Sequence, residues 1–129
     1  RYLSAASPEA DLTLIANIVY MVNIQNTQTL IVTLPNSPQT GDIVRLLDVG
    51  GNLKYDTTLV VRTPETSGTP IQGDSTGTLF GDRLTPYPSG ELVVQTPNAA
   101  FALIYLGAVD SNDQIGIPTS VQGWWLMEV

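Results

Sequence analysis

The sequence predicts an all-β protein, either an antiparallel β-sandwich or a compact barrel-like module. Apolar runs of about five to eight residues, the usual length of strands, recur along the chain between turn residues. Eleven glycines and nine prolines separate these runs. Helical spacing of apolar residues is hard to find anywhere. Together these observations indicate sheets that pack face to face or close on themselves.

The chain of 129 residues is most simply one domain. Residues 1–10 lack sustained periodicity and are predicted to be a lead-in segment or linker. Residues 11–129 are predicted to form a single β domain. The sequence begins without an initiator Met and without the long apolar core of a signal peptide, so we expect a fragment or a trimmed product of a longer chain.

The first half of the domain predicts a series of apolar strands. Residues 15–24 fit either a pair of strands or one bent strand. Residues 30–34 alternate in the manner of a strand, which Pro35 ends. Residues 43–49 are mostly apolar on both faces, as in a strand covered on both sides. The dense turn signal Asp48-Val-Gly-Gly-Asn52 follows.

The second half predicts strands around a loop-rich middle. Residues 55–62 are rich in β-branched Thr and Val, which favour a strand. Residues 63–90 are rich in turn residues, but such a long stretch rarely lacks all structure in a compact domain. Short strands are therefore expected near Ile71 and at 79–80. The last three predicted strands cover 91–96, 101–106 and 121–129.

Charge and composition exclude several classes of function. Twelve acidic and five basic residues give a net charge of −7. Such a surface repels phosphate backbones and anionic lipid, so we expect no nucleic-acid partner. No apolar stretch approaches the roughly 20 residues of a membrane-spanning helix, so no membrane insertion is expected. The absence of His and Cys excludes thiol nucleophiles, Ser-His-Asp catalysis and the usual zinc sites.

The carboxylates form no pair suited to catalysis. Glycosidases need two carboxyl groups roughly 5–10 Å apart, whereas Asp42 and Asp48 lie at the two ends of one predicted strand, about 20 Å apart. Both are better explained as turn residues. The stretch 110–113 resembles part of a calcium loop but lacks its register and terminal Glu. We therefore predict that the chain is not an enzyme and has no catalytic, metal-binding or cofactor-binding residues.

Two arginines lie inside predicted apolar strands, where a charge needs a partner. Arg45 and Arg62 are expected to pair with Asp42, Asp48 or Asp56. Such ion pairs would be structural and their net stabilisation small.

Trp124 and Trp125 are the sharpest candidates for binding. Adjacent strand residues face opposite ways, so one ring can lie in the core while the other stacks on a sugar or anchors a protein contact. The alternative, which we favour, is that both are buried, one in the protein and one under a loop or a neighbouring subunit. The residues expected to set turns are Gly41, Asp42, Asp48, Gly50, Gly51 and Gly73. Those expected in the core or an interface are Leu30, Val32, Leu46, Val61, Leu103, Tyr105, Trp124 and Trp125.

Six short motifs follow one another over about residues 12–129. They are Leu34-Pro-Asn-Ser-Pro-Gln-Thr-Gly-Asp-Ile-Val44, Asp48-Val-Gly-Gly-Asn52, Val60-Val-Arg62, Ile71-Gln-Gly73, Phe101-Ala-Leu-Ile-Tyr105 and Gly123-Trp124. Their order and approximate spacing resemble a β-rich module of tail-fibre and baseplate wedge proteins from large contractile-tailed bacteriophages. The segment 73–90 is longer than the usual link of that family, and if it projects it could contact a neighbouring protein.

The resemblance implies a non-catalytic homotrimer located in the virion, in a tail fibre or baseplate, after synthesis in the host cytoplasm. Residues 11–129 would then be part of a longer fibre or baseplate chain and would contact other tail or baseplate proteins. The leading hypothesis is a structural module that mediates subunit assembly and supports host attachment. The alternative is a β-sandwich that binds a host-surface carbohydrate or receptor, using the Trp pair and the loop from 63 to 90.

Overall fold

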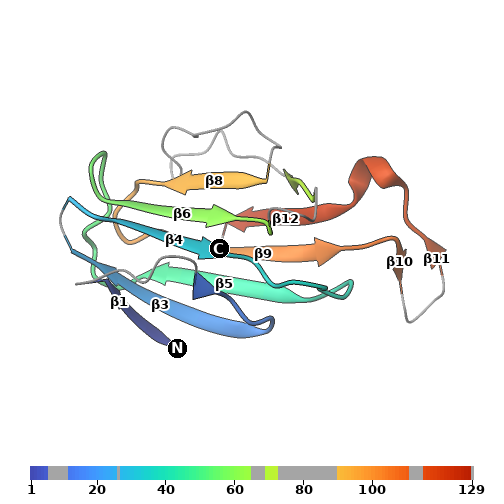
Figure 1. Cartoon of the computed structure of the whole chain (residues 1–129), viewed down its shortest axis with the longest axis horizontal. Coiled ribbons are helices and arrows are strands. Elements are labelled where there is room, and N and C mark those ends of the chain that lie inside the picture. Colours follow the sequence, from blue (N-terminus) through green and yellow to red (C-terminus); the bar gives the residue numbers. More distant parts are fainter. Residues whose placement is uncertain (6–11, 26, 65–68, 73–89, 111–114, 129) are drawn as a thin grey trace.

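The computed structural model is almost all β, with two mixed sheets packed against each other (Figure 1). The structure describes residues 1–5, 12–25, 27–64, 69–72, 90–110 and 115–128. Within these ranges there is no α-helix, and the one helical element is a 3-10 turn at Thr119–Val121. None of the described residues belongs to a helix long and apolar enough to cross a membrane.

The larger sheet has six strands and the smaller has four. In spatial order the larger contains β1 (Tyr2–Ala5), β3 (Ile18–Ile24), β5 (Ile43–Asp48), β9 (Ala100–Leu106), β12 (Gly123–Glu128) and β7 (Ile71–Gln72). The smaller contains β2 (Leu12–Thr13), β4 (Thr29–Thr33), β6 (Thr58–Arg62) and β8 (Glu91–Val94). A two-stranded ribbon of β10 (Val109–Asp110) and β11 (Ile115–Gly116) extends from one end (Figure 1).

The predicted antiparallel arrangement is wrong for half of the fold, because successive strands alternate between the two sheets. From β1 to β9 every odd-numbered strand lies in the larger sheet and every even-numbered strand in the smaller. The turn segments are therefore arches between sheets rather than hairpins within one. Two strands of the same sheet are separated by two reversals, so β1, β3 and β5 run parallel, as do β2, β4 and β6. Strand β9 pairs antiparallel with both β5 and β12, and β8 pairs antiparallel with β6.

Several strand boundaries differ from the prediction. The expected lead-in contains a strand, since Tyr2–Ala5 pairs with β3 at the edge of the larger sheet. The stretch 15–24 holds one strand, which begins at Ile18 after Asn17 takes a positive φ of 65°. Strand β6 is shorter than 55–62, because Lys54 and Thr57 form an isolated bridge that precedes it. The strand predicted near Ile71 is present as β7, and the one predicted at 79–80 lies outside the described residues.

The core lies between the sheets and is filled by alternate residues of each strand. In β3 the burial pattern alternates, so that Tyr20, Val22 and Ile24 are fully enclosed while Val19 and Met21 are exposed. The buried hydroxyl of Tyr20 accepts a hydrogen bond from the backbone N–H of Ile15 at 2.7 Å, so burial leaves it paired. The same alternation in the other long strands produces one continuous apolar core.

Strand β5 is covered on one face only, which corrects the expectation of cover on both sides. Val44, Leu46 and Asp48 are buried, whereas Arg45 is exposed and Leu47 only half-buried. The inner face packs on the smaller sheet. The outer face stays open within the single chain although most of its residues are apolar.

Candidate functional site

Asp48 is a buried structural carboxylate. Its side chain, 5% exposed, accepts backbone N–H groups from Gly51 at 3.1 Å, Leu53 at 3.4 Å and Asn98 at 3.0 Å. The first two donors belong to the arch between β5 and β6, and the third belongs to the turn between β8 and β9. Asp48 therefore joins two arches that are distant in sequence, which is more than the local turn role predicted for it.

Asp42 has a local turn role at the opposite end of β5. One carboxylate oxygen accepts the backbone N–H of Gln39 at 2.9 Å, and the other accepts the Nδ2–H of Asn17 at 3.3 Å. The preceding Gly41 has a φ of +94° and donates its N–H to the carbonyl of Tyr105 at 2.9 Å. This turn is therefore held to both β3 and β9.

The glycines after Asp48 are required by close approach of two asparagines. A Cβ on Gly50 would lie 2.2 Å from Oδ1 of Asn23, and one on Gly51 would lie 2.9 Å from Oδ1 of Asn98. Gly51 also has a φ of +68°, which disfavours a side chain. The turn role predicted for this pair thus has a steric reason. The fourth predicted turn glycine, Gly73, lies outside the described residues.

The structure records an ion pair for Arg62, and its partner is none of the aspartates that were predicted. Arg62 of β6 pairs with Glu91 of β8, its register partner, with Nε and Oε2 3.4 Å apart. Lys54 pairs with Asp56 at 3.7 Å. Among the described side chains, no three acidic, His or Cys residues gather where they could hold a metal ion. Most of the loop fragment at 110–113 lies outside the described residues.

The predicted core residues lie between the two sheets. Leu30, Val32, Leu46, Val61, Leu103 and Trp124 are all at most 4% exposed. Tyr105 is partly buried, and its ring centroid lies 5.3 Å from that of Trp124, its register partner, with the planes inclined at 57°. Trp125 points the other way and is half-buried, with its Nε1–H donated to the carbonyl of Val121 at 2.7 Å. The two tryptophans therefore have different surroundings, one in the core and one on the outer side.

The outer face of the six-stranded sheet, the side turned away from the core, is a candidate binding surface. The pairing registers place its side chains in rows across four strands, and Tyr2 of β1 extends one row to the sheet edge. The rows are Met21–Leu47–Ala100, Val19–Arg45–Ala102–Met127 and Ile43–Ile104–Trp125. Because neighbouring strands lie about 4.8 Å apart, these rows form a mostly apolar surface. Arg45 interrupts it, Ala102 is buried within it, and Gln72, the register partner of Trp125, lies at its far edge.

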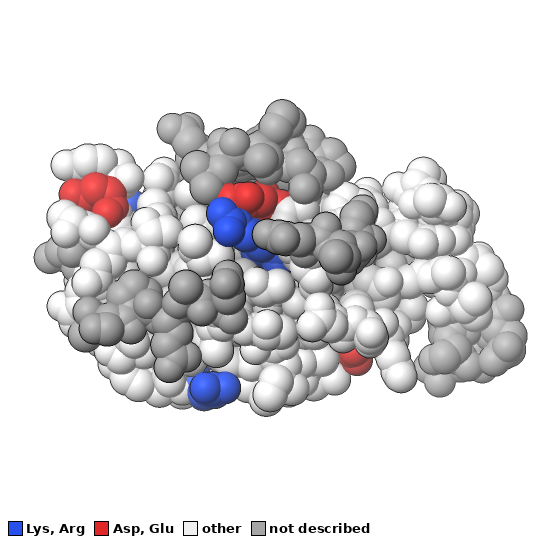
Figure 2. Space-filling view, viewed as in Figure 1, with Lys and Arg blue, Asp and Glu red and all other residues white. Residues whose placement is uncertain are grey.

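Exposure and charge distinguish this outer face. Val19 is 41% exposed, Met21 38% and Met127 39%, although all three are apolar. Arg45 is the one charged side chain among the described residues of the face. Figure 2, drawn in the view of Figure 1, shows that the charged side chains of the described residues are few and scattered on the side it presents. The sequence analysis selected Trp125 of this face as a core or interface residue and Arg45 as a charge that needs a partner, but not its exposed Val and Met residues, although the apolar pattern on both faces of 43–49 was a signal for them.

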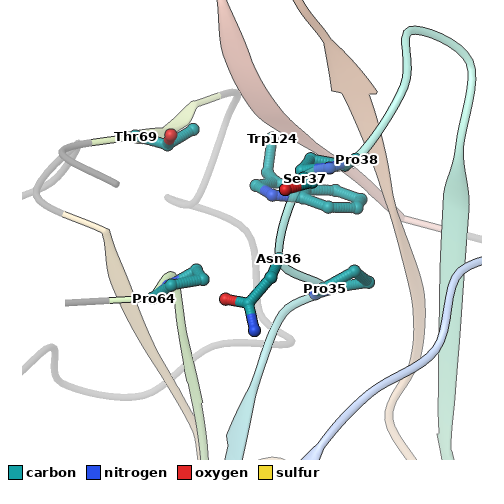
Figure 3. Close-up of a pocket in the computed structure, with 7 residues that line it drawn as sticks. All are labelled: Pro35, Asn36, Ser37, Pro38, Pro64, Thr69 and Trp124. Atoms are coloured by element: carbon teal, nitrogen blue, oxygen red, sulfur yellow. The ribbon is translucent and has the colours of Figure 1, made fainter. Parts of the chain in front are cut away.

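A second candidate feature is a pocket of about 220 Å³ beside Trp124 (Figure 3). It lies where the arch from β4 to β5 meets the end of β6 and the segment before β7. The lining residues are Pro35, Asn36, Ser37, Pro38, Pro64, Thr69 and Trp124. Trp124 was a candidate from the sequence, but the other lining residues were not predicted to form a pocket with it. The segments that contain them come together only in the folded chain.

Fold and site together describe an all-β chain with an apolar sheet face and a small uncharged pocket. Comparison with protein-family models finds none that matches the chain, and a search of curated proteins finds no match either. The likeness to phage fibre and baseplate modules therefore rests on the motifs of the chain alone.

Proposed function

We propose that this chain is a non-enzymatic structural module of a phage tail fibre or baseplate. It folds as a β-sandwich, mediates subunit assembly in the virion and supports host attachment. The motifs of the sequence suggest the class of protein. The observation that carries the assembly role is the apolar outer face of the six-stranded sheet.

An outer face of this composition calls for a covering partner. Strand β5 has the apolar pattern of a strand buried on both sides, yet the chain itself covers only its inner side. Contiguous exposed apolar surface usually marks a contact with another molecule. Rows of Met, Val, Leu and Ile that spread over several strands suit packing against a protein better than binding a small ligand.

The charges favour a second copy of this chain as that partner. Lys54 and Arg62 already pair with carboxylates of their own chain, whereas Arg45 stands exposed among apolar side chains. A chain with a net charge of −7 has surplus carboxylates elsewhere on its surface that can face Arg45 of a second copy. In a ring such as a homotrimer, the contact joins two different surfaces, so Arg45 need not face its own copy.

Light scattering across a range of concentrations tests this proposal. We expect a trimer for the wild-type chain and a monomer for Met21→Glu, because a carboxylate in an apolar interface loses its hydration. The matched control is Tyr55→Glu, which adds the same charge at a side chain that is 83% exposed and lies outside the outer face. A wild-type monomer at every concentration, or a control that dissociates as readily, would overturn the assembly role.

The alternative function, a carbohydrate- or receptor-binding module, is favoured by the pocket beside Trp124. An exposed Trp ring can stack on a sugar. Because Trp124 is only 1% exposed, Trp125 is the one of the two whose ring is available for such stacking. Binding of the chain to a glycan array and to host cells tests this function as a whole. Silence in both measurements would eliminate it without affecting the assembly role.

A further inference from the structure

Both methionines of the chain lie on the outer face of the six-stranded sheet. The chain contains two methionines and no cysteine. Met21 belongs to β3 and Met127 to β12, and β5 and β9 separate these strands in the sheet. The pairing registers place Met21 in the row of Leu47 and Met127 in the row of Arg45. Every sulfur atom of the chain therefore lies on the surface that we propose for assembly.

These two side chains are open to solvent in the single chain. Met21 is 38% exposed and Met127 39%, whereas the residues beside them in the strands, Tyr20, Val22 and Leu126, are buried. Strand β3 is paired on both sides, with β1 and with β5, so the exposure of Met21 is that of a side chain on an intact sheet. A small oxidant in solution can therefore approach the thioether without unfolding of the chain.

A peroxide changes the character of such a side chain without changing the backbone. The thioether sulfur takes one oxygen from hydrogen peroxide and is oxidised by two electrons, while the O–O bond breaks and the other oxygen leaves as water. The product is methionine sulfoxide, whose S=O group is polar and accepts hydrogen bonds. Burying this oxygen in an apolar contact without a donor is unfavourable. Oxidation therefore opposes the covering of the outer face.

We propose that Met21 and Met127 are modification sites at which a peroxide controls subunit assembly. Conversion of both thioethers to sulfoxides in the free chain prevents a second copy from covering the outer face. The inference rests on the proposed assembly function and adds its regulation. The free subunit is the sensitive form, because the contact itself shields the same side chains. Methionine sulfoxide reductases, which return the sulfoxide to the thioether, restore association.

A packing role within the chain is the competing explanation of the two methionines. Met fills irregular gaps in apolar cores because its side chain is flexible. Met21 and Met127 do not belong to the core cluster, and more than a third of each is exposed. Their flexibility suits a surface that adapts to another molecule. If the two side chains served only the packing of their own chain, oxidation would leave association unchanged.

Oxidation of the dissociated chain tests the inference. The chain is diluted until light scattering reports a monomer, treated with hydrogen peroxide, and checked by mass spectrometry for one added oxygen on each methionine. After the peroxide is removed, we expect association to be weaker about tenfold or more, equivalent to about 1.4 kcal/mol. An unchanged circular dichroism spectrum should show that the oxidised chain is folded. Treatment with reductases for both sulfoxide epimers should restore the original association.

The matched control is the double variant Met21→Leu/Met127→Leu. Leucine keeps an apolar side chain of similar volume and has no sulfur, so this variant should associate as the wild type does and ignore peroxide. Equal losses in the variant and the wild type would overturn the inference, since the damage would then lie at other residues. So would oxidised wild type that associates normally, which leaves the assembly role standing, or loss of the β spectrum on oxidation. An untreated chain that is monomeric at every concentration would overturn assembly and this inference together.

Discussion

The carboxylate of Asp48 accepts the backbone N–H of Asn98 at 3.0 Å, across 50 positions of sequence. In return, the N–H of Asp48 donates to the carbonyl of Ala99 at 2.8 Å. With its bonds to Gly51 and Leu53, this one side chain connects the arch that follows β5 to the turn that precedes β9. The two antiparallel neighbours β5 and β9 are thereby aligned at one end of the larger sheet.

Replacing Asp48 should therefore destabilise the fold strongly. Asp48→Ala leaves three backbone N–H groups without their acceptor, and we expect the free energy of unfolding to fall by about 3 kcal/mol or more. Urea denaturation monitored by Trp fluorescence measures this. The control is Asp42→Ala at the other end of β5, where the carboxylate hydrogen bonds are exposed to solvent and the expected loss is about 1 kcal/mol. Equal losses at the two positions would contradict the bridging role.

Three glycines should respond to alanine in a graded order. Gly116 has open space around it and no positive φ, so Gly116→Ala should change stability little. Gly41 also has open space but a φ of +94°, so its loss should be about 1 kcal/mol. Gly51 combines a φ of +68° with the oxygen of Asn98 only 2.9 Å from a new Cβ, and its loss should be larger, about 2 kcal/mol. Thermal unfolding of the three variants measures the order, and Gly116→Ala as the worst of them would refute it.

The two tryptophans should differ in what they stabilise. Trp124→Ala removes a ring from the core and should lower the free energy of unfolding by about 3–5 kcal/mol. Trp125→Ala, on the outer face, should cost less stability but should weaken self-association. Denaturation together with light scattering separates the two effects. A Trp124→Ala variant as stable as the wild type would contradict the assignment of that ring to the core.

Because the charged Arg45 lies on the outer face, subunit assembly should depend on the salt concentration. Arg45→Met keeps the apolar stem and removes the charge, so subunit association should weaken about fivefold, equivalent to about 1 kcal/mol. The variant should also lose the salt dependence that the wild-type contact shows. Lys54→Met is the control, because Lys54 pairs with Asp56 of its own chain. Sedimentation at low and high NaCl measures the strength of association and its salt dependence. Identical salt responses of the wild type, Arg45→Met and Lys54→Met would exclude Arg45 from the contact.

The sequence did not predict most of the outer face or of the pocket, and one physical reason accounts for both. Alternation along 18–24 and 43–48 indicates which side chains share a face, but it does not indicate which strands become neighbours. The row Val19–Arg45–Ala102–Met127 exists because four strands distant in sequence meet in register. The partner of Arg62 was mispredicted for the same reason, since Glu91 comes beside it only through the pairing of β6 with β8.

By itself the sequence determined the β class, the turn positions at 41–42 and 48–52, and the inward set that contains Leu46, Leu103 and Trp124. These follow from local rules, because a period of two, a glycine with positive φ and a proline act within a few residues. Only the tertiary structure decided that successive strands change sheets, that pairing is mixed and that Asp48 reaches Asn98. Those features depend on hydrogen bonds between segments far apart in the chain, and their partners are set by the packing of the whole core.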